Sequence, residues 1–514
     1  MKRIFRAVKL TAVLACMAAW VAACGGGSGS LDNELRLRVI NASPDAPPIN
    51  FLVDNVLFFP LDYKSGTRYT YLTPAPRAMG LEVVLPGDDV LIEESRSLLA
   101  GREYTTIAVG KLGENGSSTL QMLNIDNAIA VVPAGTTRLQ FVHAVPDTAA
   151  IDVYLTAPTD SLDAATPAFT LAGFREISAQ QDFLSGDAES WRIRVTPAGD
   201  KATILLASGP ETLRASVSLL FVVVPNTGTG TAPISLVTND GTFGGEILDV
   251  TTPADVRVYN VSPDLPALTA TAERALRKDT VPPDPPLASP CIYDPTLASS
   301  DVQCVAPAPE VTTLVTGLGY PAAHGYASLD FSVPPPAGYL LLNSANAYSF
   351  KVAATGVPAT ILFGANLSLV QGRRNSLLAL GLVPVPSGDT VVAKNLTVLS
   401  DDVRPFARTT KLRIVDAAPA GNSVDVYIEL QGTDITNENA SLGGLVAGSS
   451  TGHFSFEPGL YTVSFTTAGT KTVLASADFN AASGSVFTVV LVDTARSVSS
   501  DGKPPAVMVV DDLL

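Results

Sequence analysis

The sequence is poor in the residues that build metal centres and disulfide networks. It has three histidines and four cysteines in 514 residues, and only 16% of its residues are charged. So few potential ligands argue against a metal-rich or disulfide-dense protein. No stretch beyond the N-terminal segment approaches the roughly 20 apolar residues that a membrane-spanning helix requires. Because 46% of the residues are hydrophobic, the chain has enough apolar surface to form packed cores, which argues against intrinsic disorder.

Positive charge and catalytic motifs are also scarce. Lys and Arg total 33 against 49 Asp and Glu, a formal charge of −16. A surface this negative repels phosphate backbones, so we exclude a nucleic-acid partner. The chain has no G-x-S-x-G nucleophile motif and no glycine-rich phosphate loop. We therefore predict no enzymatic activity and no cofactor.

Glycine and proline are abundant, with 40 and 38 residues. Both residues interrupt regular structure, and this composition favours all-β modules with many turns over a helical bundle. The length corresponds to about three to five domains.

The N-terminus predicts export and lipid anchoring. Residues 1–23 have a basic start and an apolar stretch that ends in small residues, as in a signal peptide. The signal ends in Val-Ala-Ala-Cys, which resembles the lipobox of bacterial lipoproteins, with Cys24 as the lipidation site that would carry diacylglyceryl and palmitate. Residues 24–34 continue as a Gly/Ser-rich flexible tether. The alternative is ordinary secretion with a chance cysteine.

Such an anchor predicts a location. Two or more acyl chains hold a protein stably on a bilayer. Residue 25 is glycine and not aspartate, which by analogy with enteric lipoproteins favours the outer membrane. We expect a lipid-anchored cell-envelope protein, at the periplasmic face or the cell surface, with the membrane as a partner through its lipid.

The most informative feature is a fourfold internal repeat. Each copy starts with an apolar strand followed by a proline turn, and the four copies begin at Leu37, Leu139, Val256 and Leu412. A hairpin glycine lies deeper in each copy, at Gly87, Gly199, Gly356 and Gly469, where a positive φ is expected. A long β run follows, and a polar pair ends each copy: Asp126-Asn127, Asn239-Asp240, Asp401-Asp402 and Asp511-Asp512.

These landmarks predict four tandem immunoglobulin-like β-sandwich modules, each with about seven strands. Their expected ranges are 35–134, 135–252, 253–407 and 408–514, and the third contains an insertion at about 273–320. The first strands, with the sequence Arg38-Val39-Ile40-Asn41-Ala42-Ser43-Pro44-Asp45 in the first copy, resemble the bacterial family called domain of unknown function 4397. The resemblance implies β-rich repeats on exported and lipid-anchored proteins, and it implies no activity.

Candidate binding residues are few. The Asp residues of the closing pairs, Asp126, Asp240, Asp401, Asp402, Asp511 and Asp512, could supply oxygen ligands for calcium. The alternative is an Asx turn that ends the strand. His143 occupies the column of Asn41, Asn260 and Asp416, where we expect the side chain to bond loop backbone. No spacing indicates a zinc site, and we assign no metal.

Two cysteines remain in the mature chain besides Cys24. Cys291 and Cys304 lie in the proline-rich insertion of the third module, and in an oxidising compartment we expect them to form a disulfide. A redox-active pair would favour a closer spacing.

Function is therefore expected in scaffolding, spacing or adhesion by a non-enzymatic protein that meets a protein or glycan ligand. One alternative is a carbohydrate- or matrix-binding lipoprotein, with Tyr320, Tyr326 and Tyr339 as exposed aromatic residues. Trp191 is interpreted as a packing residue, with a sugar platform as its alternative role. A second alternative is a hydrolase with an unrecognised site.

Overall fold

The computed structural model describes residues 34–87, 89–185, 191–263, 265, 267–274, 276–278, 311–330, 339–341, 346–358, 360–381, 395–418, 423–493 and 505–513. The expected signal peptide, Cys24, Cys291 and Cys304 lie outside the described residues. Within these ranges the chain is all-β, as predicted, with short 3-10 turns at Gly116–Ser118 and Ile435–Asn437. No helix among them is both long enough and apolar enough to cross a bilayer.

Module 1 shows the plan that the four copies share. Its two four-stranded sheets have the orders β4-β1-β7-β8 and β3-β2-β5-β6. The strands are β1 (Leu35–Asn41), β2 (Ile49–Val53), β3 (Val56–Leu61), β4 (Thr70–Tyr71), β5 (Ala75–Val83), β6 (Val90–Leu98), β7 (Arg102–Val109) and β8 (Gln121–Ala128). This is one strand more than the approximately seven expected, because β4 is too short to show an alternating pattern.

Module 2 packs a five-stranded sheet, β12-β9-β15-β16-β17, against the four-stranded sheet β11-β10-β13-β14. Its strands are β9 (Thr136–His143), β10 (Ile151–Thr156), β11 (Phe169–Leu171), β12 (Gln181–Leu184), β13 (Trp191–Pro197), β14 (Leu206–Glu211), β15 (Val217–Pro225), β16 (Ile234–Asn239) and β17 (Gly244–Ile247).

Module 3 has one sheet of β22, β18, β27 and β28 with β23 added to β18, and a second sheet in the order β21-β19-β25-β26. A separate pair joins β20 to β24. The strands are β18 (Ala254–Val261), β19 (Ala267–Arg274), β20 (Leu276–Lys278), β21 (Val311–Gly319), β22 (Ala322–Ala323), β23 (Ala327–Leu329), β24 (Tyr339–Leu341), β25 (Asn346–Ala354), β26 (Ile361–Leu369), β27 (Arg374–Leu380) and β28 (Asn395–Asp401).

Module 4 returns to the plan of module 1, with sheets β32-β29-β35-β36 and β31-β30-β33-β34. Its strands are β29 (Thr410–Asp416), β30 (Val424–Leu430), β31 (Leu442–Leu445), β32 (Phe454–Phe456), β33 (Gly459–Thr467), β34 (Val473–Ala481), β35 (Val486–Val492) and β36 (Ala506–Asp511).

The predicted hairpin glycines lie between the last two strands of the second sheet in each module. Gly199, Gly356 and Gly469 have φ angles of 77°, 85° and 74°, the left-handed region that glycine enters at little cost. Gly87 does not have a positive φ, so the prediction holds in modules 2, 3 and 4 only.

The expected insertion of module 3 is narrower than predicted. The sequence predicts an insertion at about 273–320, whereas Val311–Gly319 forms β21 and pairs with β19 from Ala267 to Glu273. In the other modules the corresponding edge strand also pairs with the second strand of the module. The proline-rich sequence before residue 311 obscured this strand, because it separates β21 from its neighbour by more than 30 residues.

In every module the first strand pairs in parallel with the long β run near the end of the repeat: β1 with β7, β9 with β15, β18 with β27, and β29 with β35. These strands are buried on both faces. In β35, Val489 and Leu491 belong to the core of module 4, whereas Val490 and Val492 belong to a cluster shared with module 3. Since alternate residues of a strand point to opposite faces, one strand supplies two cores.

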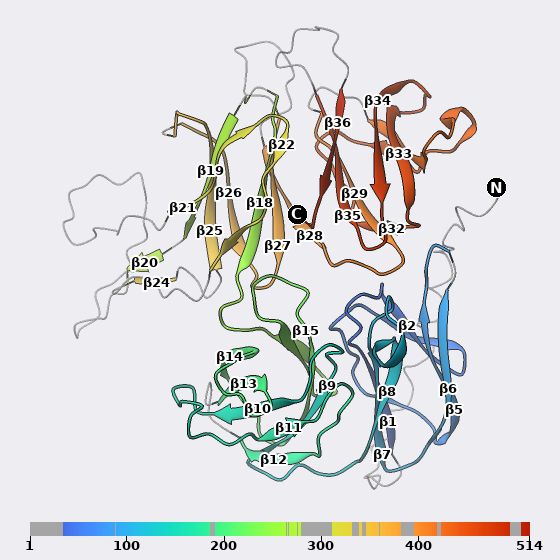
Figure 1. Ribbon diagram of the computed structural model, residues 1–514, viewed down its shortest axis with the longest axis vertical. Helices are drawn as coiled ribbons and strands as arrows, with labels where there is room; N and C mark the ends of the chain where they lie inside the picture. Colours follow the sequence, from blue (N-terminus) through green and yellow to red (C-terminus); the bar gives the residue numbers. More distant parts are fainter. Residues whose placement is uncertain are drawn as a thin grey trace, which may run out of the picture.

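The modules therefore pack in pairs through these sheets. Modules 1 and 2 share an apolar cluster built from β1, β7, β9 and β15, and modules 3 and 4 share one built from β18, β27, β29 and β35. Figure 1 shows modules 3 and 4 side by side above modules 2 and 1, with the chain folding back on itself. The four modules thus form a closed arrangement and not an extended string.

Among the described residues, hydrogen bonds join the two pairs in two regions. Between modules 2 and 3, the Gln371 side chain donates to the Asp249 carbonyl at 2.9 Å. The segment 402–409, which links modules 3 and 4, contacts the proline turn of module 1. There the Ala407 amide donates to the Asp45 carbonyl at 2.7 Å, and the Arg404 guanidinium donates to the carbonyls of Pro44 and Ala46.

Candidate functional site

The closing polar pairs form part of the module interfaces. In modules 3 and 4, Arg413 Nη1 lies 2.6 Å from Asp401 Oδ1, and Arg257 Nη2 lies 2.7 Å from Asp512 Oδ1. Each arginine comes from the first strand of one module, and each aspartate ends the opposite module. All four side chains are at most 2% exposed. The two ion pairs therefore fasten the modules to each other reciprocally.

Hydroxyl groups complete this buried network. Asp401 Oδ2 accepts from Ser376 at 2.6 Å and from the Tyr326 hydroxyl at 2.8 Å. Asp512 Oδ2 accepts from Thr488 at 2.7 Å and lies 3.3 Å from His453 Nε2. Burial acts to raise the pKa of Asp512, but His453, Arg257 and Thr488 outweigh it and lower that pKa. Ionised carboxylates tolerate burial only when paired and hydrogen-bonded in this way.

Modules 1 and 2 use the same positions with neutral partners. Arg38 Nη1 donates to Asn239 at its carbonyl (2.8 Å) and its Oδ1 (2.9 Å). In the opposite direction, Asn127 Nδ2 donates to Gln140 Oε1 at 2.8 Å. Arg38 also stacks on the Tyr69 ring at 4.7 Å. Arg38, Gln140, Arg257 and Arg413 each follow the first residue of a copy, but the sequence does not show that they face the closing pair of a neighbouring module.

The six calcium candidates do not share a site. Each except Asp511 pairs with a basic residue: Asp126 with Arg102, Asp240 with Arg214, Asp401 with Arg413, Asp402 with Lys411, and Asp512 with Arg257. Asp511 instead accepts from the Leu513 amide at 2.9 Å. Among the residues that the structure describes, no three His, Cys, Asp or Glu side chains come together in a group that could hold a metal.

The polar column at the end of the first strand bonds loop backbone, as predicted. Asn41, Asn260 and Asp416 each accept from the amide two residues further on, and His143 Nδ1 accepts from Val145 in the same way. Asp416 differs in one respect. Its Oδ2 is buried with no hydrogen-bond partner among the described residues, and burial raises its pKa to about 6.

We expect Asp416→Asn to stabilise module 4 at neutral pH. The folded state holds the Asp416 proton up to about pH 6, whereas the unfolded chain releases it near pH 3.8, so the wild type loses stability as pH rises between these values. The full loss is about 3 kcal/mol. Asparagine keeps the acceptor for Ala418 and carries no charge. Hydrogen exchange of β29 and β35 in the full chain measures this: the variant should exchange more slowly at pH 8, with little difference at pH 4. Equal protection at pH 8 would contradict it.

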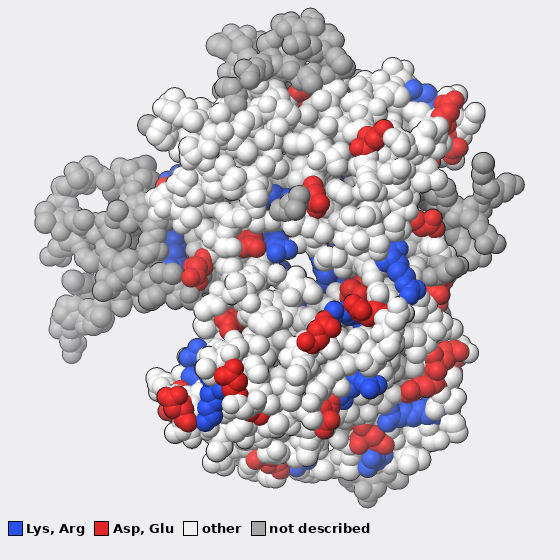
Figure 2. Space-filling view, in the orientation of Figure 1, with Lys and Arg blue, Asp and Glu red and all other residues white. Residues whose placement is uncertain are grey.

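A cavity of 670 Å³ lies where modules 1, 2 and 3 meet. In Figure 2 the surface is hollowed between the upper and lower halves of the molecule, with basic and acidic side chains around the hollow. Its charged lining consists of Asp62, Lys64, Glu246, Arg373, Arg374, Asp401, Asp402 and Arg404, and its hydroxyl groups come from Tyr63, Ser65, Thr227, Thr238 and Ser400. Apart from the calcium candidates Asp401 and Asp402, the sequence indicates none of these residues as part of a site, because they come from segments that lie up to 342 residues apart.

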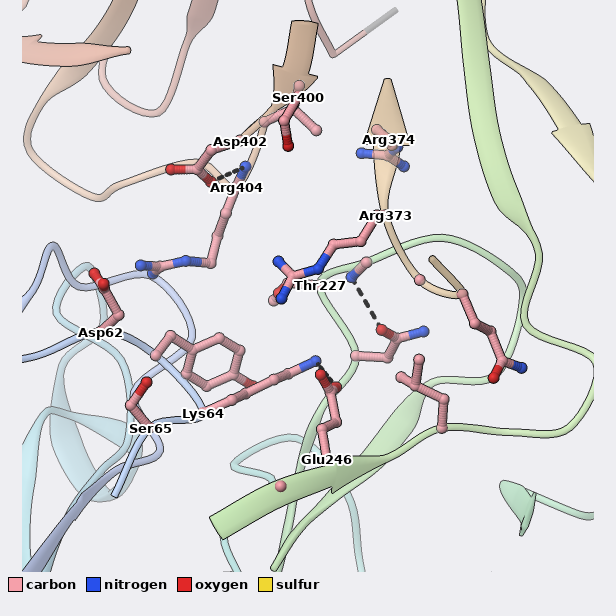
Figure 3. Close-up of a pocket in the computed structure, with 18 of the residues that line it drawn as sticks. Asp62, Lys64, Ser65, Thr227, Glu246, Arg373, Arg374, Ser400, Asp402 and Arg404 are labelled. Atoms are coloured by element: carbon pink, nitrogen blue, oxygen red, sulfur yellow. Dashed lines mark hydrogen bonds and ion pairs between the residues drawn. The ribbon is translucent and has the colours of Figure 1, made fainter. Parts of the chain in front are cut away.

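Most charges at the cavity are already paired. Lys64 Nζ lies 2.5 Å from Glu246 Oε1, and Asp402 pairs with the buried Lys411 of module 4 at 2.7 Å. Arg374 pairs with Asp255 at 3.3 Å. Arg373 is exposed, and among the described residues no hydrogen bond or ion pair engages its guanidinium. Figure 3 shows it pointing toward Thr227 and Lys64.

The proposed aromatic binding residues are not free for a sugar. Tyr326 is half-buried, its hydroxyl bonds Asp401, and the guanidinium of Arg257 stacks on its ring at 4.5 Å. Tyr320 is also half-buried, and its hydroxyl donates to the carbonyl of Asp493. Tyr339 begins β24, and its side chain lies outside the described residues. Trp191 packs against the core of module 2, as predicted.

Comparison with known proteins supports the repeat. Residues 36–154 and 410–514 match the family described as "Domain of unknown function (DUF4397)". Two separate regions of the chain thus match this family. The two matches fall on module 1 with the start of module 2 and on module 4. Modules 2 and 3, most of which lies between the two matched regions, follow the same strand order.

No curated protein matches the chain. A solved structure described as "The Bacillus anthracis TIE protein" matches 90% of this chain and 67% of its own chain, at 9% identity and a TM-score of 0.14. A similarity at this level carries no argument about the modules or their function.

Proposed function

We propose that this protein is a non-enzymatic, lipid-anchored component of the bacterial cell envelope, at the outer membrane, that acts as a compact scaffold or adhesion module. The observation that supports it most is the use of the repeated polar residues. Arg257, Arg413, Asp401 and Asp512 are buried in ion pairs between modules, so they hold the assembly together and do not face a substrate. The match to DUF4397 is consistent with an interaction module.

The closed arrangement determines what kind of scaffold this is. An extended string would place its modules at increasing distances from the membrane, whereas the two joined pairs present one broad surface on a single tether. Partners would therefore meet several modules together. The negative net charge of −16 favours ligands that tolerate or complement an acidic surface.

Cys24→Ser is expected to abolish anchoring. Only Cys24 stands at the end of the lipobox-like segment, so its thiol is the expected acceptor of lipid. In the variant, labelled palmitate should no longer be incorporated and the protein should leave the membrane fraction or stay unprocessed. Cys304→Ser, which removes a thiol elsewhere, is the control and should remain anchored. Mass spectrometry that finds wild-type protein with an unmodified N-terminus would overturn the proposal.

A further inference from the structure

The central cavity brings four cationic side chains together with four carboxylates, in a protein that is acidic overall. Arg373 reaches it from module 3 and Lys64 from module 1, and Figure 3 shows the two side chains pointing toward each other across the cavity, beside Thr227 of module 2. Two cations approach each other in this way only at an electrostatic cost, since like charges in a partly desolvated space repel. Burial is the largest cause of the lowered pKa of Lys64; Glu246 acts to raise that pKa, and Arg373 makes a smaller lowering contribution.

The position of Lys64 is fixed by the backbone. Lys64 has a φ of 66°, and its amide donates to the Asn41 carbonyl at 2.8 Å. The corresponding amides of Arg175 and Gly448 donate to His143 and Asp416, at the same column of the repeat. The turn therefore requires a left-handed residue, which glycine provides at module 4. At module 1 the chain has a lysine there, directed into the cavity.

Among the residues that the structure describes, one carboxylate contacts Lys64, but none contacts Arg373. Glu246 is bound to Lys64 at 2.5 Å, and the carboxylates of Asp401 and Asp402 are engaged by Arg413 and Lys411. Asp62 lies near the Arg404 guanidinium, on the other side of the cavity. The planar guanidinium of an arginine binds carboxylates and phosphates through two parallel hydrogen bonds.

We propose that the cavity is a binding site for a small oxyanion, a phosphate or a carboxylate, held between Arg373 and Lys64 with the Thr227 hydroxyl as a further donor. At 670 Å³ the cavity is large enough for a ligand that carries such a group, because small-molecule sites span about 300–1,000 Å³. The ligand would contact modules 1, 2 and 3 at once and so brace the junction between the two pairs. The site is independent of the lipid anchor, so its failure leaves the proposed function untouched.

The test is calorimetric titration of the purified full chain with inorganic phosphate and, separately, with glucuronate. Saturable binding of phosphate alone identifies a phosphate group as the ligand chemistry, and binding of glucuronate alone identifies a carboxylate. Arg373→Gln should lower the affinity for the anion about tenfold or more, because it removes a charge-assisted pair of hydrogen bonds. Arg68→Gln is the matched control: Arg68 is exposed and does not line the cavity, so the same loss of charge there should leave affinity unchanged.

A second variant should change the affinity for the anion in the opposite direction. Glu246→Gln removes the carboxylate that competes for Lys64 and should tighten binding of the same anion. Absence of saturable heat with both anions, equal affinity in wild type and Arg373→Gln, or weaker binding in Glu246→Gln would each overturn the proposal. Equal weakening in Arg373→Gln and Arg68→Gln would also overturn it, by showing that only net charge matters.

Discussion

Replacement of Arg413 by leucine is expected to destabilise the pair of modules 3 and 4 by about 3–5 kcal/mol, because it leaves the carboxylate of Asp401 buried without its cation. Asp401 is fully buried in this pair and Arg413 is 2% exposed. Ser376 and Tyr326 would still donate to the carboxylate, but neither supplies a charge. Thr488, which Arg413 contacts at 3.0 Å, would lose a partner as well.

Calorimetric melting of the full chain measures this effect. For a unit of this size the transition of modules 3 and 4 should fall by on the order of 10 °C. Arg102→Leu is the matched control, because Arg102 and Asp126 are also 2.6 Å apart but are 35% and 36% exposed. An exposed pair contributes less than about 1 kcal/mol. A similar loss in both variants would show that burial between modules is not the cause.

A double variant distinguishes two causes of the destabilisation: the unpaired charge of Asp401 and the lost packing of the Arg413 side chain. Replacing both Arg413 and Asp401 by leucine removes the two charges together, and buried ion pairs are often replaced by apolar residues at little net cost. The double variant should therefore be more stable than Arg413→Leu alone. If it is less stable, the cost of the single substitution comes from packing and not from the unpaired charge.

The sequence predicted the repeat and the β-sandwich class because both depend on local patterns. Alternating apolar residues, proline turns and hairpin glycines recur at fixed places in each copy, and each corresponds to a strand or turn of the structure. The sequence did not predict strand β21, because a long proline-rich segment separates it from its partner β19. Pairing between distant strands leaves no local trace in a single sequence.

The contacts between modules were harder to predict from the sequence, although the strands carry one indication of them. Strands β15 and β35 are apolar at nearly every position, which indicates burial on both faces and hence a second layer beyond the sandwich. Arg257 and Arg413 interrupt such double-sided strands, and a charged residue there requires a buried partner. The identity of that partner depends on how two modules dock, so the sequence indicates Asp512 and Asp401 only as turn residues or calcium ligands. The lining of the central cavity depends on three modules and had no signal of this kind.

The central claim is that the pair of modules, and not the single module, is the stable unit. Separation of module 4 would expose Val415, Val490 and Val492, each at most 2% exposed in the pair, and would leave Asp512 and Arg413 without their partners. Three such valines correspond to about 4–5 kcal/mol of lost burial.

The most direct measurement compares thermal unfolding of residues 408–514 with that of residues 253–514. We predict that the single module melts at least 20 °C below the pair, and that Arg413→Leu, harmful in the pair, is neutral or stabilising in the single module, where Asp401 is absent. Equal melting temperatures, with Arg413→Leu having the same effect in both fragments, would contradict the account and show that the modules are independent units.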